Sequence, residues 1–219
     1  MYKYLYILIL TFAFQGIYSQ KDPEAKKILD RVSARSQGDY PIQVSFEYIY
    51  EDLMDKQTTT QEGTLILGEN RFKLRVGETV VYSDGKTVWN HLTSANEVYV
   101  SDAEEGSNSD DFFISDPSDL FTFYKEGFKY RLKGEIEINN RILNEIDIFP
   151  EDLDKNYHTV KLLVDKKDLR IYSAQAYGKH GANHTVILKD YKAGIKTDDK
   201  TFIFDPAEHP GVEVVDTRF

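Results

Sequence analysis

Hydrophobic and polar residues alternate over much of this chain with a period of two, the pattern of β-strands that bury one face. In the first such run, five residues share one face: Ile42, Val44, Phe46, Tyr48 and Tyr50. The alternation resumes at residues 65–67 and 72–76. Turn sequences separate the runs, namely Gly68-Glu69-Asn70, Gly77-Glu78, Asp84-Gly85, Ser94-Ala95-Asn96, Asn139-Asn140, Lys166-Lys167-Asp168, Lys179-His180-Gly181 and Asp198-Asp199. The pattern predicts a long antiparallel meander.

One segment ahead of these strands has the period of a helix instead. Asp22 is a suitable N-cap, Pro23 suits the first helical position, and Gly38 suits the end. The apolar residues recur at i, i+3, i+4 and i+7: Ala25, Ile28, Leu29 and Val32. We predict one short amphipathic helix here, with a narrow apolar stripe.

A segment without periodicity interrupts the strands. Residues 102–111 are acidic and rich in Ser and Gly, which predicts a mobile loop. Asp116 and Pro117 then supply an N-cap and a first helical residue. Apolar residues follow at Leu120, Phe121, Phe123 and Tyr124. We predict a short helix over residues 116–124, which either covers a hollow as a movable lid or plugs one end of a barrel.

The first twenty residues differ from the rest of the chain. Lys3 precedes an almost unbroken apolar run over residues 5–14, and small residues follow at 16–19. A membrane span needs about 20 apolar residues. We therefore expect residues 1–20 to be a cleaved secretory signal peptide rather than an uncleaved anchor. The remaining length suits a single domain over residues 21–219.

Composition and charge narrow the possible partners. Cys is absent, so the exported chain has neither a disulfide framework nor the residue that bacterial lipoproteins acylate. Without residues 1–20 the chain keeps 26 basic residues against 37 acidic ones, a net charge of −11. Such a surface disfavours nucleic acid and anionic membrane surfaces. After export we expect a soluble protein that is free in an aqueous compartment.

No sequence pattern indicates catalytic chemistry. His180 and His184 lie four residues apart, but a glycine between them argues against a helix that could present both to a metal. Gly85-Lys86-Thr87 resembles the end of a phosphate-binding loop, but Val80 stands where that motif needs its first glycine. Residues 106–110 lack the last glycine of a nucleophile elbow. We expect no enzymatic activity, no cofactor and no metal.

Four segments together resemble the outer-membrane lipoprotein carrier protein family (LolA). They are Ser83-Asp84-Gly85-Lys86-Thr87-Val88-Trp89, Ile28-Leu29-Asp30-Arg31-Val32-Ser33 with Phe46 beyond it, Gly63-Thr64-Leu65-Ile66-Leu67, and Phe202-Ile203-Phe204-Asp205-Pro206 followed by residues 210–216. The likeness extends over nearly the whole chain after residue 20. It implies a mainly β (α+β) fold, in which one strongly curved antiparallel sheet forms an incomplete barrel covered by the N-terminal helix and a short lid helix.

The resemblance also implies a function. Members of the family bind the acyl chains of lipoproteins released by an inner-membrane ABC transporter and carry them across the periplasm. The cargo here would be acylated lipoproteins, the outer-membrane acceptor is unknown, and we expect a monomer. An alternative is an envelope sensor or regulator that detects lipid or lipoprotein with the same half-barrel; such proteins usually carry an additional C-terminal domain.

The strand pattern and the resemblance together name candidate site residues. We predict that the acyl chains contact Phe46, Tyr48, Tyr50, Leu65, Leu67, Phe72, Leu74 and Trp89, and that the lid contributes Leu120, Phe121 and Tyr124. An ordinary packed core would produce the same alternation. Many family members carry an Arg-Pro pair after the strand that matches residues 63–67, and this Arg holds the lid closed. Here Arg71 lies slightly beyond that position and is the candidate latch.

Overall fold

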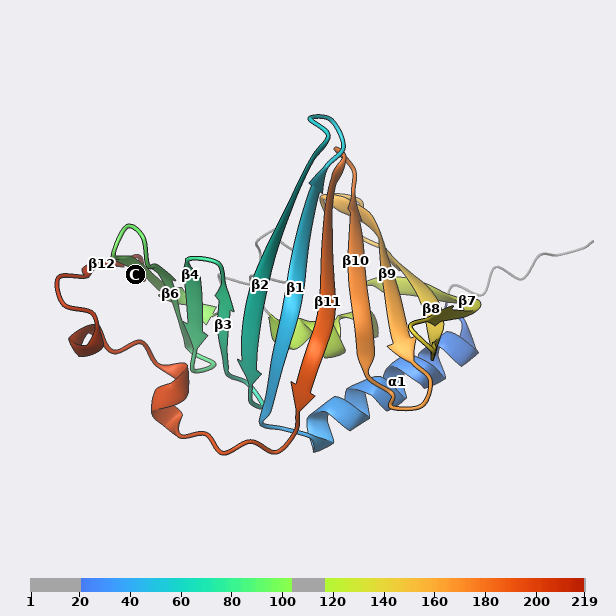
Figure 1. The fold of residues 1–219 in the computed structure, drawn as a ribbon, viewed down its shortest axis with the longest axis horizontal. Coiled ribbons are helices and arrows are strands. Elements are labelled where there is room, and N and C mark those ends of the chain that lie inside the picture. Colours follow the sequence, from blue (N-terminus) through green and yellow to red (C-terminus); the bar gives the residue numbers. More distant parts are fainter. Residues whose placement is uncertain (1–20, 104–116, 219) are drawn as a thin grey trace, which may run out of the picture.

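The computed structural model describes residues 21–103 and 117–218. Their strands form one large, open, curved sheet of twelve strands, with α1 (Pro23–Gly38) on one side of it (Figure 1). The strands are β1 (Ile42–Asp52), β2 (Gln57–Leu67), β3 (Phe72–Val76), β4 (Thr79–Ser83), β5 (Thr87–Leu92), β6 (Glu97–Asp102), β7 (Phe128–Ile138), β8 (Arg141–Pro150), β9 (Tyr157–Asp165), β10 (Ile171–Gly178), β11 (Ala182–Lys192) and β12 (Glu213–Asp216). The mainly β fold expected from the alternation is confirmed.

The strand order differs from one continuous meander. It runs β12-β6-β5-β4-β3-β2-β1-β11-β10-β9-β8-β7, so two antiparallel meanders meet where β1 pairs with β11. In addition, β12 pairs with β6 in parallel. Seven of the eight predicted turns connect neighbouring strands, but Asp198-Asp199 does not. Asp198 instead caps η3 (Asp199–Phe202), a short 3-10 helix in the segment that leads to β12.

The opening helix forms as its sequence predicts. The Asp22 side chain accepts hydrogen bonds from the backbone N–H groups of Glu24 and Ala25, which satisfies two donors that a helix start leaves without partners. A second Asp22 oxygen accepts from the backbone N–H of Leu132 in β7, at 3.0 Å. The cap therefore also ties the helix to the edge of the sheet.

The segment predicted as one lid helix contains two shorter helices. The first is η1 (Pro117–Phe121) and the second is η2 (Phe123–Lys125), both of the 3-10 type. The predicted start at Asp116 and most of the predicted loop lie outside the described residues. η1 contacts α1, β2 and β3, whereas η2 contacts β7. Both lie behind the central strands in the view of Figure 1.

Two hydrophobic clusters lie on opposite faces of the sheet. The larger, here called the inner cluster, packs β1–β4 and β7–β11 against α1 and the two 3-10 helices. The smaller, the outer cluster, contains Val80, Tyr82, Val98 and Phe204, with Trp89 and Val212 packed against it. The alternation within β4 explains the division, because Val81 belongs to the inner cluster and its two neighbours to the outer one.

Candidate functional site

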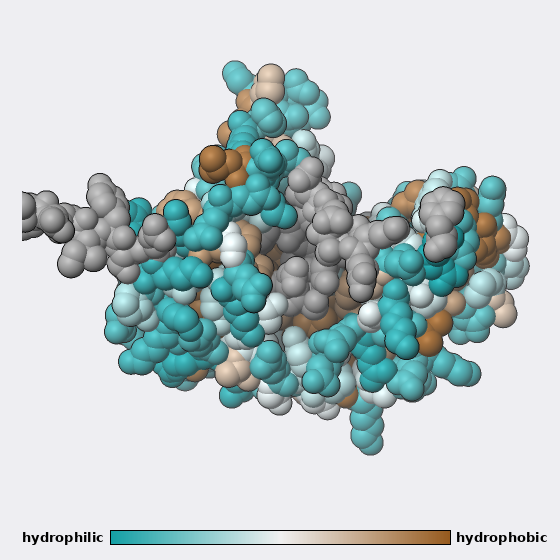
Figure 2. Space-filling view, turned by 180° about the vertical axis from the view of Figure 1, so that it is seen from behind, coloured by the Kyte–Doolittle hydropathy of each residue, from teal (hydrophilic) through white to brown (hydrophobic). Residues whose placement is uncertain are grey.

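The inner face of the sheet is the candidate binding surface. Its centre is lined by buried aliphatic and aromatic side chains from neighbouring strands, and hydrogen-bonded pairing places them side by side: Val44 opposite Leu65, Leu65 opposite Leu74, and Leu74 opposite Val81. Figure 2 shows the molecule from behind the view of Figure 1, with some hydrophobic residues visible near the middle and mainly hydrophilic residues around them. Such a surface offers an apolar environment and few polar groups.

Five of the eight predicted acyl-chain contacts lie fully in this cluster. They are Phe46, Leu65, Leu67, Phe72 and Leu74, all at most 4% exposed. Tyr48 is half-buried and packs against the same cluster, and Tyr50 is half-buried one step further along β1. The structure therefore brings these seven residues to one face. Their contact with an acyl chain stays a prediction.

Trp89 is placed elsewhere. It lies directly opposite Tyr82 in the β4–β5 pair, and it packs against the outer cluster. Its neighbour Val88 packs against the inner cluster instead. Because successive side chains of a strand point to opposite faces, Trp89 faces away from the surface that carries Phe46.

The three predicted lid residues are buried against the inner cluster: Leu120, Phe121 and Tyr124. The Tyr124 hydroxyl donates a hydrogen bond of 3.0 Å to Oδ1 of Asp30 on α1, and Lys26 forms an ion pair of 2.6 Å with the other Asp30 oxygen. Burial and the Asp30 carboxylate raise the pKa of Tyr124, so the donated proton is retained. The Lys26 hydrogen bond lowers the pKa of Asp30, which keeps the acceptor ionised.

The candidate latch, Arg71, contacts a different segment from the lid residues. Its guanidinium forms an ion pair with Asp199 and lies over the Phe202 ring, 4.6 Å from the ring centroid. Phe202 is completely buried. In the described part of the chain, Arg71 therefore holds η3 against the β2–β3 turn.

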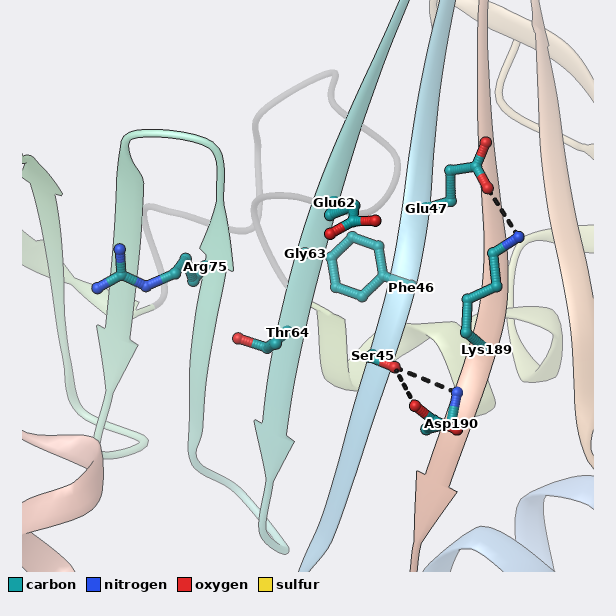
Figure 3. Close-up of a pocket in the computed structure, with 9 residues that line it drawn as sticks. All are labelled: Ser45, Phe46, Glu47, Glu62, Gly63, Thr64, Arg75, Lys189 and Asp190. Atoms are coloured by element: carbon teal, nitrogen blue, oxygen red, sulfur yellow. Dashed lines mark hydrogen bonds and ion pairs between the residues drawn. The ribbon is translucent and has the colours of Figure 1, made fainter.

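A polar pocket of about 490 Å³ lies between β1, β2, β3 and β11 (Figure 3). Lys189 forms an ion pair of 2.7 Å with Glu47, and Ser45 exchanges two hydrogen bonds with Asp190. The β1–β11 register shifts at this point, which places two β11 residues beside Ser45. The remaining lining residues are Phe46, Glu62, Gly63, Thr64 and Arg75. Lys189 and Glu47 partner each other and Asp190 is bonded to Ser45, and we assign no ligand to this pocket.

Gly85-Lys86-Thr87 forms a hairpin turn, as predicted. The Asp84 carboxylate accepts hydrogen bonds from the N–H groups of Lys86 and Thr87, at 2.9 and 2.8 Å. A carboxylate of the chain itself thus occupies the donors that a phosphate-binding loop would offer to its ligand.

Metal-ligating side chains are dispersed over the described residues. Within 21–103 and 117–218, no three His, Cys, Asp or Glu side chains are grouped so that they could hold a metal ion. None of the helices in this part of the chain combines the length and the apolar composition that a membrane span requires.

The open curved sheet with α1 on its inner face defines a class, the LolA-like fold. An uncharacterized conserved protein from Thermus thermophilus matches 88% of this chain with 99% of its own, at 14% identity and a TM-score of 0.55. The chain is also similar to LprF from Mycobacterium bovis, at 14% identity and a TM-score of 0.50. The match covers 82% of this chain and 98% of LprF. A LolA superfamily protein from Nitrosomonas europaea matches at 14% identity and a TM-score of 0.45. This match covers 83% of the present chain and 98% of the Nitrosomonas protein.

The sequence itself identifies the family. The profile of the outer membrane lipoprotein carrier protein LolA matches residues 15–142, more than half of the chain. The chain belongs to this family. No curated protein matches it.

Sequence reasoning missed three partners in the site. Asp30, which accepts from Tyr124, lies 94 residues away from it, and His184, which bonds Tyr48, lies 136 residues away. Gly63, which lies opposite Phe46, was part of the quoted family motif but had no assigned role. No local pattern marks such contacts, because they depend on which strands become neighbours.

Proposed function

We propose that the chain is a soluble carrier of the bacterial periplasm, which binds the acyl chains of lipoproteins on its inner face and delivers them to the outer membrane. The observation that carries the proposal is the apolar inner cluster, which two short 3-10 helices cover in a chain of the lipoprotein carrier family. We further propose that residues 1–20 direct export and are removed, and that the carrier acts as a monomer.

The energy of lipid transfer explains why such a protein needs an apolar face. Burying each methylene group is worth about 0.8 kcal/mol, so one acyl chain of about 15 carbons favours an apolar site over water by roughly 12 kcal/mol. A lipoprotein with two or three chains cannot cross water unaided on a useful timescale. A carrier has to offer a comparable apolar surface while still releasing its cargo.

The two 3-10 helices are proposed as the movable cover. Leu120 and Phe121 occupy part of the inner cluster, so an acyl chain that entered there would displace them. Each helix has five residues or fewer and contributes little stability of its own. The Tyr124–Asp30 hydrogen bond then serves as the latch to α1. Hydrogen exchange of residues 117–125 should increase when a lipopeptide binds.

The acyl chains of the cargo leave the apolar interior of the membrane for the apolar inner face of the carrier. The net free-energy change of this transfer is therefore small. We propose that an ATP-driven transporter of the inner membrane supplies the work. The excess of acidic residues favours basic patches on that donor, with association that weakens as salt rises.

The test is the release of labelled lipoprotein from vesicles that contain the transporter, with ATP and the purified carrier varied separately. We expect release only when both are present, with the mass of the cargo unchanged. Efficient release by the carrier alone would contradict the partnered mechanism. A changed cargo mass would indicate an enzyme.

A further inference from the structure

The inner face changes character along its strands. On β1 the residues of this face are buried up to Phe46 and half-buried from Tyr48 onward. On β11 the change is from Val186, which is buried, to His184, which is half-buried. On β2, Leu65 is buried, whereas the polar side chains of Gln61 and Thr59 are exposed. The apolar surface therefore ends on three adjacent strands.

Pairing places the polar residues in one belt across these strands. Tyr48 lies opposite Gln61, and Tyr50 lies between Thr59 on one side and His184 on the other. We call these five residues the polar belt. It borders the apolar surface directly, because Tyr48 still packs against the inner cluster.

A hydrogen bond organises the centre of the belt. The Tyr48 hydroxyl and Nδ1 of His184 lie 2.7 Å apart, and the Tyr50 ring lies 5.2 Å from the His184 ring, centroid to centroid. When the hydroxyl donates to Nδ1 of the neutral ring, the proton of that ring is on Nε2, which is then a hydrogen-bond donor. Donors beside an apolar surface suit a ligand whose carbonyl groups adjoin its hydrocarbon chains.

We infer that the polar belt recognises the ester or amide carbonyls at the head of an acylated ligand, with Tyr48 and His184 as the residues that fix its orientation. This inference rests on the proposed function, because it assigns the chains of the same ligand to the apolar surface beside the belt. It gives Tyr48 and Tyr50 a role different from the other predicted acyl-chain contacts. In this arrangement the acyl chains of the ligand extend toward Phe46 and Leu74, and its ester or amide carbonyls stay at the polar belt.

The experiment measures binding of two probes by fluorescence. One is a labelled dipalmitoyl lipopeptide, which has carbonyls, and the other is diphenylhexatriene, an apolar rod without polar atoms. Tyr48→Phe removes the hydroxyl and keeps the ring. The matched control is Tyr177→Phe, which also removes a tyrosine hydroxyl, one that bonds Gln175. Tyr177 follows the inner-facing Ala176 and therefore lies on the other face of the sheet.

We expect Tyr48→Phe to weaken lipopeptide binding about three- to tenfold, the range of one lost hydrogen bond, and to leave diphenylhexatriene binding unchanged. Tyr177→Phe should change neither. Equal weakening for both probes, or no weakening for either, would overturn the assignment of the belt while leaving the carrier function in place. Failure of the unaltered protein to bind either probe would instead contradict the proposed function.

A third probe separates two sources of the carbonyls. Dioctanoyl phosphatidylethanolamine carries glyceryl esters but no acylated cysteine. Weakening by Tyr48→Phe for this lipid as well as the lipopeptide assigns the belt to glyceryl esters. Weakening for the lipopeptide alone assigns it to the amide and peptide end of the lipoprotein.

Discussion

The Phe46 ring occupies the space that a side chain at Gly63 would need. The two residues lie opposite each other in the β1–β2 pair, and a Cβ atom built on Gly63 would be 2.2 Å from Cζ of Phe46. A real Cβ cannot approach a ring atom so closely, so any other residue at 63 forces the ring or the strand to move. The glycine thus allows a large aromatic side chain in the centre of the inner cluster.

We expect Gly63→Ala to lower the free energy of unfolding by about 1–3 kcal/mol, the usual cost of overpacking. Urea denaturation measures the change. Gly38→Ala is the control, because nothing lies within 4 Å of a Cβ at that position. In a Phe46→Ala background the penalty of Gly63→Ala should shrink. An undiminished penalty there would show that the ring is not its cause.

The hydroxyl of Tyr124 should stabilise the packing of η2 against α1. We expect Tyr124→Phe to cost about 1–2 kcal/mol of unfolding free energy, because it removes a hydrogen bond to the Asp30 carboxylate. Hydrogen exchange of residues 117–125 should rise more than that of the strands. Tyr130→Phe, on the neighbouring ring 6.2 Å away, is the control. Equal effects of the two substitutions would argue against a specific latch.

His91 should make the protein less stable in mild acid. It is 2% exposed, and neither ring nitrogen has a hydrogen-bond partner in the described residues. Burial, together with His209 and Arg75, lowers the pKa of His91. As the pH falls, His91 is therefore protonated in the unfolded chain before it is protonated in the folded protein. The free energy of unfolding should fall as the pH drops below about 6.5.

His91→Phe tests this origin of the acid sensitivity. The substitution keeps an aromatic ring beside Phe204 and His209, whose centroids lie 5.1 and 4.5 Å from that of His91. We expect a smaller loss of stability on acidification through this range, and a gain of about 1 kcal/mol at neutral pH from removing unpartnered polar atoms. The exposed His180 is the control position, as His180→Asn. An unchanged pH dependence in His91→Phe would refute the prediction.

Arg71 should secure the C-terminal segment rather than the two 3-10 helices of the inner face. We expect Arg71→Ala to increase hydrogen exchange of residues 199–204, because the ion pair with Asp199 and the contact with the Phe202 ring are lost. Residues 117–125 should be unaffected. Arg75→Ala, four residues further along the chain on β3, is the control. Increased exchange of residues 117–125 in Arg71→Ala would instead support the latch inferred from the family resemblance.

Local patterns predicted the elements well, because each depends on residues that are close in the sequence. The Asp22 cap and the 3.6-residue spacing specified α1, and alternation together with Gly and Asn turns specified most of the strands. The segment at 117–125 was less predictable. Its helical signals were correct, but packing against the inner cluster resulted in two 3-10 helices instead of one longer helix.

Alternation marks which residues share a face, but it does not say what covers that face. This is why Trp89 was grouped with Phe46 although it packs with Tyr82 on the other side. In β4 four consecutive residues are buried, because both faces of that strand are covered. When both faces of a strand are covered, apolar residues occur on both, and alternation no longer shows which face is which.

The sequence by itself determined the β-rich class, the opening helix, the turns and the family, since these follow from short-range spacing and a recognisable order of motifs. Only the tertiary structure decided that β1 pairs with β11, that Tyr124 bonds Asp30, and that His184 lies beside Tyr48 and Tyr50. These contacts join residues about 90 to 150 positions apart. Their energies depend on the curvature and strand order of the whole sheet, which no local stretch of the chain encodes.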